Sequence, residues 1–294
     1  MEPTYEFDAN LFDNADQFDS EFFKRFDLEH RYGPLKLNDE VSKNYLFPTL
    51  YGDVTCAIGI YLCDYKAAKA LLPHPSMEPI SMFGGRSLVI FSNYIYRNVL
   101  GIAPYNEIAM TIPGMVDAKF NTPVLPMVMN NFSKFGFYVF HMPVTSEENR
   151  IRGHRLWGLP KEVERIDLDE KNGICTTTAY DQSGQPYYKC DVPTSGKPQH
   201  FDVASNLYSR LDDELLQSPT FFQGDFNVNK NMGQLFKKAD TNEKPTLEII
   251  GDSPMAQKLR SLKIQPVPFQ TRYAKTMNSC FDLPNTDYKS PKGA

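Results

Sequence analysis

The 294-residue sequence lacks the features that mark membrane, secreted and nucleic-acid-binding proteins. No apolar run is long enough to cross a bilayer, and the first residues are acidic where a targeting peptide would be basic or apolar. Lysine and arginine are not in excess, because the net charge is -5, and this balance argues against binding to nucleic acid or to an anionic membrane. We therefore expect a cytoplasmic protein with no nucleic-acid or membrane partner.

Metal-binding and redox signatures are missing as well. The five cysteines include no Cys-x-x-Cys pair, which favours reduced thiols over a disulfide framework or a zinc site. The five histidines lack metal-ligand spacing. Motifs for dinucleotides, for nucleotide phosphates, for serine hydrolases and for zinc proteases are all absent. We expect neither a cofactor nor a bound metal.

Short β-rich runs dominate what is present. Runs such as "VTCAIGIYL" (54–62), "SLVIFSNYIYR" (87–97) and "PYNEIAMTIPGM" (104–115) are followed by a predicted antiparallel meander over residues 161–192. Residues 193–245 show no regular pattern. Since the strands are mostly linked by hairpins, they predict a largely antiparallel sheet or barrel.

Helix signals are fewer. Asp64 is placed to cap a helix that ends before Pro73. Ser146 or Thr145 would cap a second helix, which ends at Gly158. Ser253 or Asp252 would cap a third helix, which begins at Pro254. Three or four helices among many strands predict the α+β class, with a largely antiparallel β-sheet or barrel.

Residues 1–40 differ from the rest of the chain. They are acidic and rich in phenylalanine, and "DQFDSEFFKRF" spaces its phenylalanines as a short amphipathic helix would. A disordered acidic arm explains the same composition equally well. We expect an arm over residues 1–40 and a single domain over residues 41–294.

Two residues are candidates for chemistry. Glu107 is a carboxylate in the apolar run "PYNEIAM", and Tyr105 shares its strand face. A buried carboxylate is costly unless it is paired or protonated, so Glu107 is either a member of an ion pair or a proton-transfer group. Lys161 follows a Gly-Leu-Pro turn in "GHRLWGLPKEVERI". It either marks the start of a strand or directs an amine into a cavity.

These segments resemble the acetoacetate decarboxylase superfamily. "GHRLWGLPKEVERI" is similar to the family's helix that leads into Pro-Lys, and "PYNEIAM" to its Tyr-x-Glu segment. "DYKAAKALLPHPSM" and "LRSLKIQPVPF" match further segments in the same order, so the likeness spans roughly residues 31–285. The resemblance implies an acetoacetate decarboxylase-like barrel, a catalytic domain over residues 41–294 and a homo-oligomer.

The resemblance also implies a reaction. Lys161 would attack the ketone of a keto acid, and the resulting iminium would accept the electrons of the bond that breaks next to it. Glu107 would move protons or orient the substrate, with Tyr105 and Trp157 in the substrate pocket. The implied activity is that of a lyase that decarboxylates a β-keto acid. Related alternatives are an aldolase-dehydratase or cyclase acting on a keto acid, and a non-catalytic member that binds a small ligand.

The sequence departs from the family's decarboxylases at two positions. They carry a second lysine where this chain has Glu162, so lowering of the Lys161 pKa would depend on burial, with Phe91, Tyr94, Met110 and Trp157 as candidate walls. They also carry an arginine at the position that falls near Val54, where this chain has none. Other arginines are the candidates to replace it: Arg86, Arg97 and Arg155.

Overall fold

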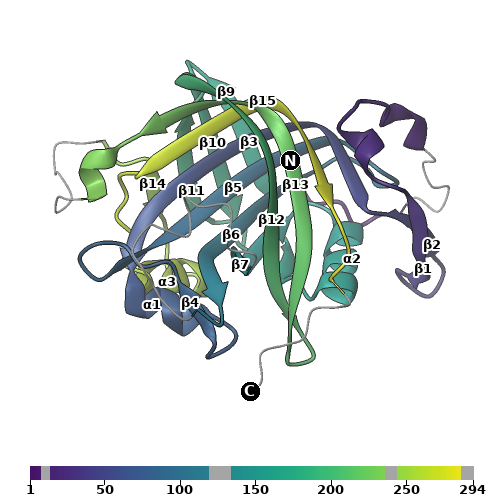
Figure 1. Ribbon diagram of the computed structural model, residues 1–294, viewed down its shortest axis with the longest axis horizontal. Coiled ribbons are helices and arrows are strands. Elements are labelled where there is room, and N and C mark those ends of the chain that lie inside the picture. The colour runs from purple at the N-terminus through teal and green to yellow at the C-terminus, as the bar shows by residue number, and fades with distance from the viewer. Residues whose placement is uncertain (8–13, 119–133, 236–243, 286–294) are drawn as a thin grey trace.

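A computed structural model describes residues 1–7, 14–118, 134–235 and 244–285 of the chain (Figure 1). Its centre is a nine-stranded sheet in the order β4-β6-β5-β3-β15-β13-β12-β7-β8. Because β6 also pairs with β7, the sheet closes on itself as a barrel. The predicted α+β class with a largely antiparallel barrel is confirmed.

The barrel strands are long and alternate between two environments. On β5 and β6, side chains of one parity face the barrel interior and those of the other parity face outward, as the pleat of a strand requires. The strands of this sheet are β3 (Thr49–Asp64), β4 (Met77–Pro79), β5 (Arg86–Val99), β6 (Tyr105–Val116), β7 (Phe135–Val144), β8 (Lys161–Val163), β12 (Lys197–Leu211), β13 (Glu214–Lys230) and β15 (Gln270–Phe281).

A second sheet of four strands covers part of the outer barrel surface (Figure 1). Its strands are β9 (Ile166–Lys171), β10 (Ile174–Tyr180), β11 (Pro186–Pro193) and β14 (Leu247–Ile249). Apolar side chains from this sheet, among them Tyr187 and Cys190, meet Phe91 and Met110 of the barrel in one buried cluster. This burial holds the two sheets together.

Three α-helices accompany the sheets within the described residues: α1 (Tyr65–Leu71), α2 (Glu147–Trp157) and α3 (Pro254–Ser261). Their N-caps are the predicted ones, since the side chains of Asp64, Ser146 and Ser253 each accept a backbone N–H three residues on. Gly158 ends α2 in the left-handed conformation, as a helix C-terminus favours. No described helix is both long and apolar enough to cross a bilayer.

The N-terminal segment packs on the barrel and contains no α-helix among its described residues. It forms two short turns, η1 (Ala15–Gln17) and η2 (Phe23–Arg25), followed by the hairpin β1 (Glu29–Lys36) and β2 (Ser42–Phe47). A further turn, η4 (Met232–Leu235), follows β13. Phe18, Phe22 and Phe23 are buried against Leu50 and neighbouring residues of the body. This apolar contact attaches the described part of the segment to the body of the protein. The proposed division at residue 40 stays a prediction.

Two expectations for strands need correction. The irregular region expected over residues 193–245 contains β12 and β13, which form one long hairpin. The predicted strand over residues 161–170 is two strands, because β8 belongs to the barrel and β9 to the covering sheet. The meander is therefore β9, β10 and β11, paired in that order.

Candidate active site

The interior of the barrel holds a cavity of about 190 Å³ with mostly apolar walls. This is larger than the ~150 Å³ cavity that accommodates benzene in an engineered protein core. Among its lining residues are Tyr94, Glu107, Lys161 and Arg272, which come from four different strands. A mostly apolar cavity with a few polar groups is the usual form of a small-molecule site.

Lys161 reaches this cavity because of the turn that precedes it. Gly158 ends α2, Leu159 N–H then donates to the carbonyl of Gly153, and the chain enters β8 beside Met142 of β7. Along β8 the burial alternates, with Lys161 buried and Glu162 exposed. The two neighbours therefore face opposite sides of the strand, and the lysine faces inward.

The Lys161 amine lies against Glu107 and Asn149. Its Nζ donates to Glu107 Oε2 at 2.6 Å and to Asn149 Oδ1, and the side chains of Lys161 and Glu107 are only 5% and 7% exposed. Glu107 also accepts a hydrogen bond from the Tyr96 hydroxyl. The lysine is therefore a buried amine beside a proton acceptor, and it does not form a surface ion pair with Glu162 or Glu164.

Burial lowers the pKa of Lys161 from its ordinary value, and Glu107 opposes that shift. The positive charge of Arg152 adds to the lowering. Arg152 is itself buried on α2, where its guanidinium lies 4.3 Å from the Tyr45 ring centre and donates to Thr49 Oγ1. The chain thus has a neighbouring cation, although Glu162 stands where the family's decarboxylases have one.

Helix α2 supplies the other contacts of the lysine. Asn149 and Gly153 are four residues apart, so they lie on the same face of the helix. A Cβ atom on Gly153 would collide with Cδ of Lys161 and stand 2.7 Å from its Cε. The glycine therefore provides the space in which the lysine side chain lies. Sequence reasoning missed Asn149, Arg152 and Gly153, and only the glycine inside a helix could have signalled a close approach.

The aromatic residues predicted around the lysine are only partly placed there. Tyr94 lines the cavity, whereas Phe91 and Met110 have the opposite parity and pack under the covering sheet. Trp157 is stacked on Phe281 and donates to the carbonyl of Asp282, so it lies behind the cavity wall. The ring centre of Tyr105 is 5.9 Å from Lys161 Nζ, although Tyr105 is not among the cavity-lining residues.

The structure does not bring the candidate arginines to the cavity. Arg86 donates to the carbonyls of Phe83 and Gln234, and Arg97 donates to Thr55 Oγ1 and the carbonyl of Asp53. Arg155 donates to the carbonyl of Lys36. The arginine that does line the cavity is Arg272 of β15, a residue that the sequence did not single out.

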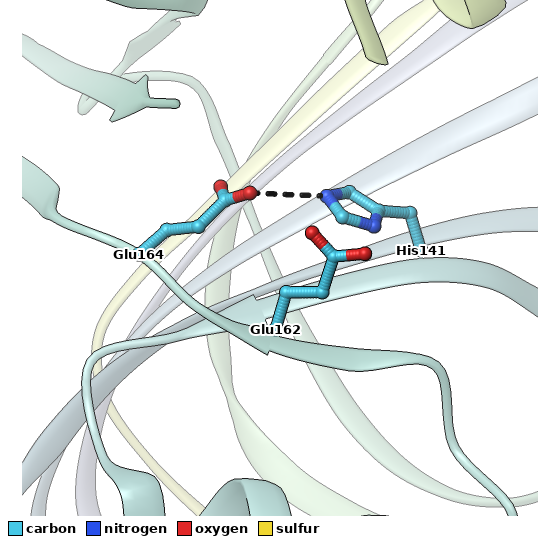
Figure 2. A group of neighbouring side chains, drawn as sticks. All are labelled: His141, Glu162 and Glu164. Carbon is cyan, nitrogen blue, oxygen red and sulfur yellow. Dashed lines mark ion pairs between the residues drawn. The ribbon is translucent and has the colours of Figure 1, made fainter. Parts of the chain in front are cut away.

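A separate polar cluster lies beside β8. His141, Glu162 and Glu164 could hold a metal ion, because one donor atom of each lies within 4.8 Å of the others (Figure 2). Burial lowers the pKa of His141 to about 3 and raises that of Glu164 to about 8. The Tyr187 hydroxyl donates to Glu164 at 2.7 Å and lies 3.3 Å from His141 Nε2. Hydrogen bonds through Tyr187 account for the neutral His141 and the protonated Glu164 lying together, and Glu162 is exposed beside them. A metal ion would first have to displace the Glu164 proton.

Comparison with known proteins gives the following relationships. The family model for acetoacetate decarboxylase (ADC) matches residues 33–198. The crystal structure of acetoacetate decarboxylase from Legionella pneumophila subsp. pneumophila str. Philadelphia 1 is similar, with a TM-score of 0.54 and 13% identity over 81% of this chain and 86% of that one. A structure titled "Structural Studies of Acetoacetate Decarboxylase" is also similar, with a TM-score of 0.53 and 16% identity over 81% of this chain and 87% of that one. No curated protein matches the sequence.

Proposed function

Because the chain belongs to the acetoacetate decarboxylase family, we propose that it is a lyase in which Lys161 forms a Schiff base with a keto acid and promotes its decarboxylation. The observation that carries the proposal is the buried contact of Lys161 with Glu107 in the wall of the barrel cavity. Burial favours the neutral amine, which is the nucleophilic form. Glu107 is near enough to exchange a proton with that amine.

The first step forms the iminium. Glu107 first takes a proton from the Lys161 ammonium, and the neutral amine adds to the ketone carbon. A second N–H proton passes to the alkoxide oxygen of the adduct, and the Glu107 carboxyl then gives its proton to the resulting hydroxyl, which leaves as water. Loss of water gives a positively charged iminium. The Glu107 carboxylate lies next to the iminium nitrogen, Nζ, and its negative charge stabilises the positive charge.

The second step breaks the carbon–carbon bond. In a β-keto acid the carboxylate is attached to the carbon next to the iminium, so the electron pair of the breaking bond moves into the iminium as CO₂ leaves. The product is a neutral enamine. Its carbon takes a proton from the pocket, and water then hydrolyses the new iminium to release the ketone and restore the amine.

Aldol-type chemistry on a keto acid is the second candidate. An enamine attacks an aldehyde as readily as it accepts a proton, and the cavity has more space than acetoacetate alone requires. The exposed Glu162 favours this candidate, since the chain departs there from the family's decarboxylases. A non-catalytic member that binds a small ligand would need no nucleophile, so the buried contact of Lys161 with Glu107 argues against it.

Release of CO₂ from acetoacetate tests the decarboxylation. The purified protein should release CO₂ faster than the spontaneous reaction, and Lys161→Met should abolish the excess. Glu107→Gln should reduce kcat by roughly 10²- to 10⁴-fold, the usual contribution of a positioned acid or base, while the melting temperature stays in the folded range. Full activity of Glu107→Gln would contradict the role of Glu107. CO₂ release equal to the spontaneous rate would restrict the proposal to other keto acids or to aldol chemistry.

We also propose that the protein acts as a homo-oligomer. The hairpin of β1 and β2 is a sheet of its own that pairs with neither larger sheet among the described residues, and Figure 1 places it at one end of the barrel. It is therefore a candidate contact between subunits. Light scattering of the purified full chain should give a multiple of 33.6 kDa, and a mass of one chain would contradict the proposal.

A further inference from the structure

We propose that Arg272 binds a carboxylate remote from the reacting ketone, so that the substrate is a keto acid with an acidic group at the far end of a carbon chain. The inference rests on the proposed function for the position of the ketone at Lys161. It concerns a residue on another strand, and it specifies the substrate class that the cavity accepts.

The pairing of the strands places Arg272 and Lys161 at the two ends of one row of residues. Arg272 pairs with Ile58, and Ile58 pairs with Ser92. Ser92 in turn pairs with Ala109. Between β6 and β7, Glu107 pairs with Val144 and Met110 pairs with His141. This register places Ala109 opposite Met142, and Met142 pairs with Lys161 of β8. Residues paired across adjacent strands share a face, and all six residues of this row line the cavity. The cavity therefore extends from the amine to the guanidinium.

Arg272 has no anionic partner in the part of the chain that the structure describes. Its Nε is buried without a hydrogen-bond partner, and no described carboxylate forms an ion pair with it. The guanidinium lies over the face of the Phe201 ring, 4.9 Å from its centre, and this cation–π contact compensates in part. A partly buried cation without an anionic partner is costly to maintain, and a guanidinium binds a carboxylate through two parallel hydrogen bonds. A bound carboxylate would supply the missing partner.

The residues between Lys161 and Arg272 determine which chemical group can lie between the ketone and the carboxylate of the substrate. Along the row it consists of Ile58, Ser92, Ala109 and Met142, and side chains such as Ile60 and Leu207 lie nearby in the same lining. Hydroxyl groups of serine, threonine and tyrosine also occur in the lining, but its exposed surface is mostly apolar, and this fits a hydrocarbon spacer better than a sugar or a peptide. The site therefore suits a ketone and a carboxylate that an apolar spacer separates. In acetoacetate a single methylene group separates the ketone from the carboxylate, so the molecule is too short to occupy both ends.

The test measures binding without the reaction. In the Lys161→Met protein, which cannot form a Schiff base, calorimetry compares 6-oxoheptanoate with its methyl ester, and acetoacetate serves as the short probe. We expect the acid to bind about tenfold or more tightly than the ester. Arg272→Met should remove this preference and Arg272→Lys should keep part of it. Acetoacetate should bind weakly and with no dependence on Arg272.

Matched controls make the result decisive. Arg97→Met removes an arginine that lies outside the cavity, and it should keep the preference for the acid. Equal binding of acid and ester with Arg272 intact would overturn the inference even if Arg272→Met failed to fold. A preference that survives in folded Arg272→Met would overturn it too, as would an Arg272-dependent preference for acetoacetate. Failure of Schiff-base formation in the wild-type protein, with this preference intact, would instead contradict only the proposed function.

Discussion

At the scale of single residues, the reactivity of Lys161 depends on charges of opposite sign close to one amine. Burial and Arg152 lower its pKa, while Glu107 raises it. Arg152 lies within an aromatic enclosure formed by Tyr45, Phe47 and Trp157. Since a neighbouring cation disfavours the protonated amine, Arg152 has the electrostatic effect that a second lysine would have.

Removing the charge of Arg152 should change the pH dependence of the reaction. In Arg152→Met the pKa of Lys161 rises, so the acidic limb of the profile of kcat/KM should move to higher pH. Arg152→Lys keeps the charge and should keep the limb close to its wild-type position. A profile that loses amplitude in Arg152→Met without moving would mean that Arg152 acts only through packing.

Glu164 should make the protein less stable as the pH rises. Its pKa is about 8 in the folded protein against an ordinary value of 4.5, so the folded state holds a proton that the unfolded state has released. Between pH 6.5 and 8 this group costs about 1.4 kcal/mol of unfolding free energy per pH unit. His141 contributes little over most of that range, because it is neutral in the folded protein and also in the unfolded chain once the pH exceeds its ordinary pKa of 6.5.

This effect is measured by urea unfolding of the wild type and of Glu164→Gln at several pH values. The glutamine side chain does not titrate, so the variant shows how the free energy of unfolding depends on pH without Glu164. From pH 6.5 to 8 the wild type should lose roughly 2 kcal/mol relative to the variant. The comparison separates Glu164 from other groups that titrate, Lys161 among them. Glu162→Gln changes an exposed neighbour and should follow the wild type. If the free energy of unfolding depended on pH in the same way for the wild type and Glu164→Gln, Glu164 would be ionised at neutral pH and the prediction would be wrong.

At the scale of elements, α2 and β8 act together, since the helix supplies the space and one of the polar contacts for the lysine on the strand. Gly153→Ala should therefore reduce activity more than stability. The added methyl group displaces the lysine side chain, which separates Nζ from Glu107. Misplacement of about 1 Å can cost roughly 10²-fold in rate. Arg155→Ala, two residues along the same helix, should retain activity, and an active Gly153→Ala would contradict the close approach.

The elements differ in how well the sequence predicts them. The helices were predictable because their caps are local, as with Ser146 and Gly158 around α2. β12 and β13 were not, since residues on their inner faces such as Ser205 and Thr220 line a cavity, which weakens the apolar alternation. A local signal was present in their turn: Asp212 and Asp213 both have positive φ, as the two-residue hairpin requires.

At the scale of the whole molecule, the site exists because the sheet closes. Motifs in the sequence identified Lys161 and Glu107, which are 54 residues apart and meet only when β6, β7 and β8 are neighbours. Arg272 carries no motif. Its place across the cavity follows from the strand order and register, which single-sequence patterns do not specify. Arg97 has the opposite parity on β5 to the cavity-lining Ser92 and Tyr94, and Arg86 is the first residue of that strand, so neither lines the cavity.

The central claim is that Lys161 is a nucleophile, and borohydride reduction in the presence of keto acids tests it most directly. Peptide mapping should find the mass of one reduced substrate on Lys161 and none in Lys161→Met. Lys43 is an internal control, because it is equally buried and pairs with Glu148 at 2.8 Å but does not line the cavity. Labelling confined to Lys161 is the expected result. Equal labelling of Lys43 and Lys161, or no labelling of Lys161 by any keto acid across the pH range of stability, would contradict the account.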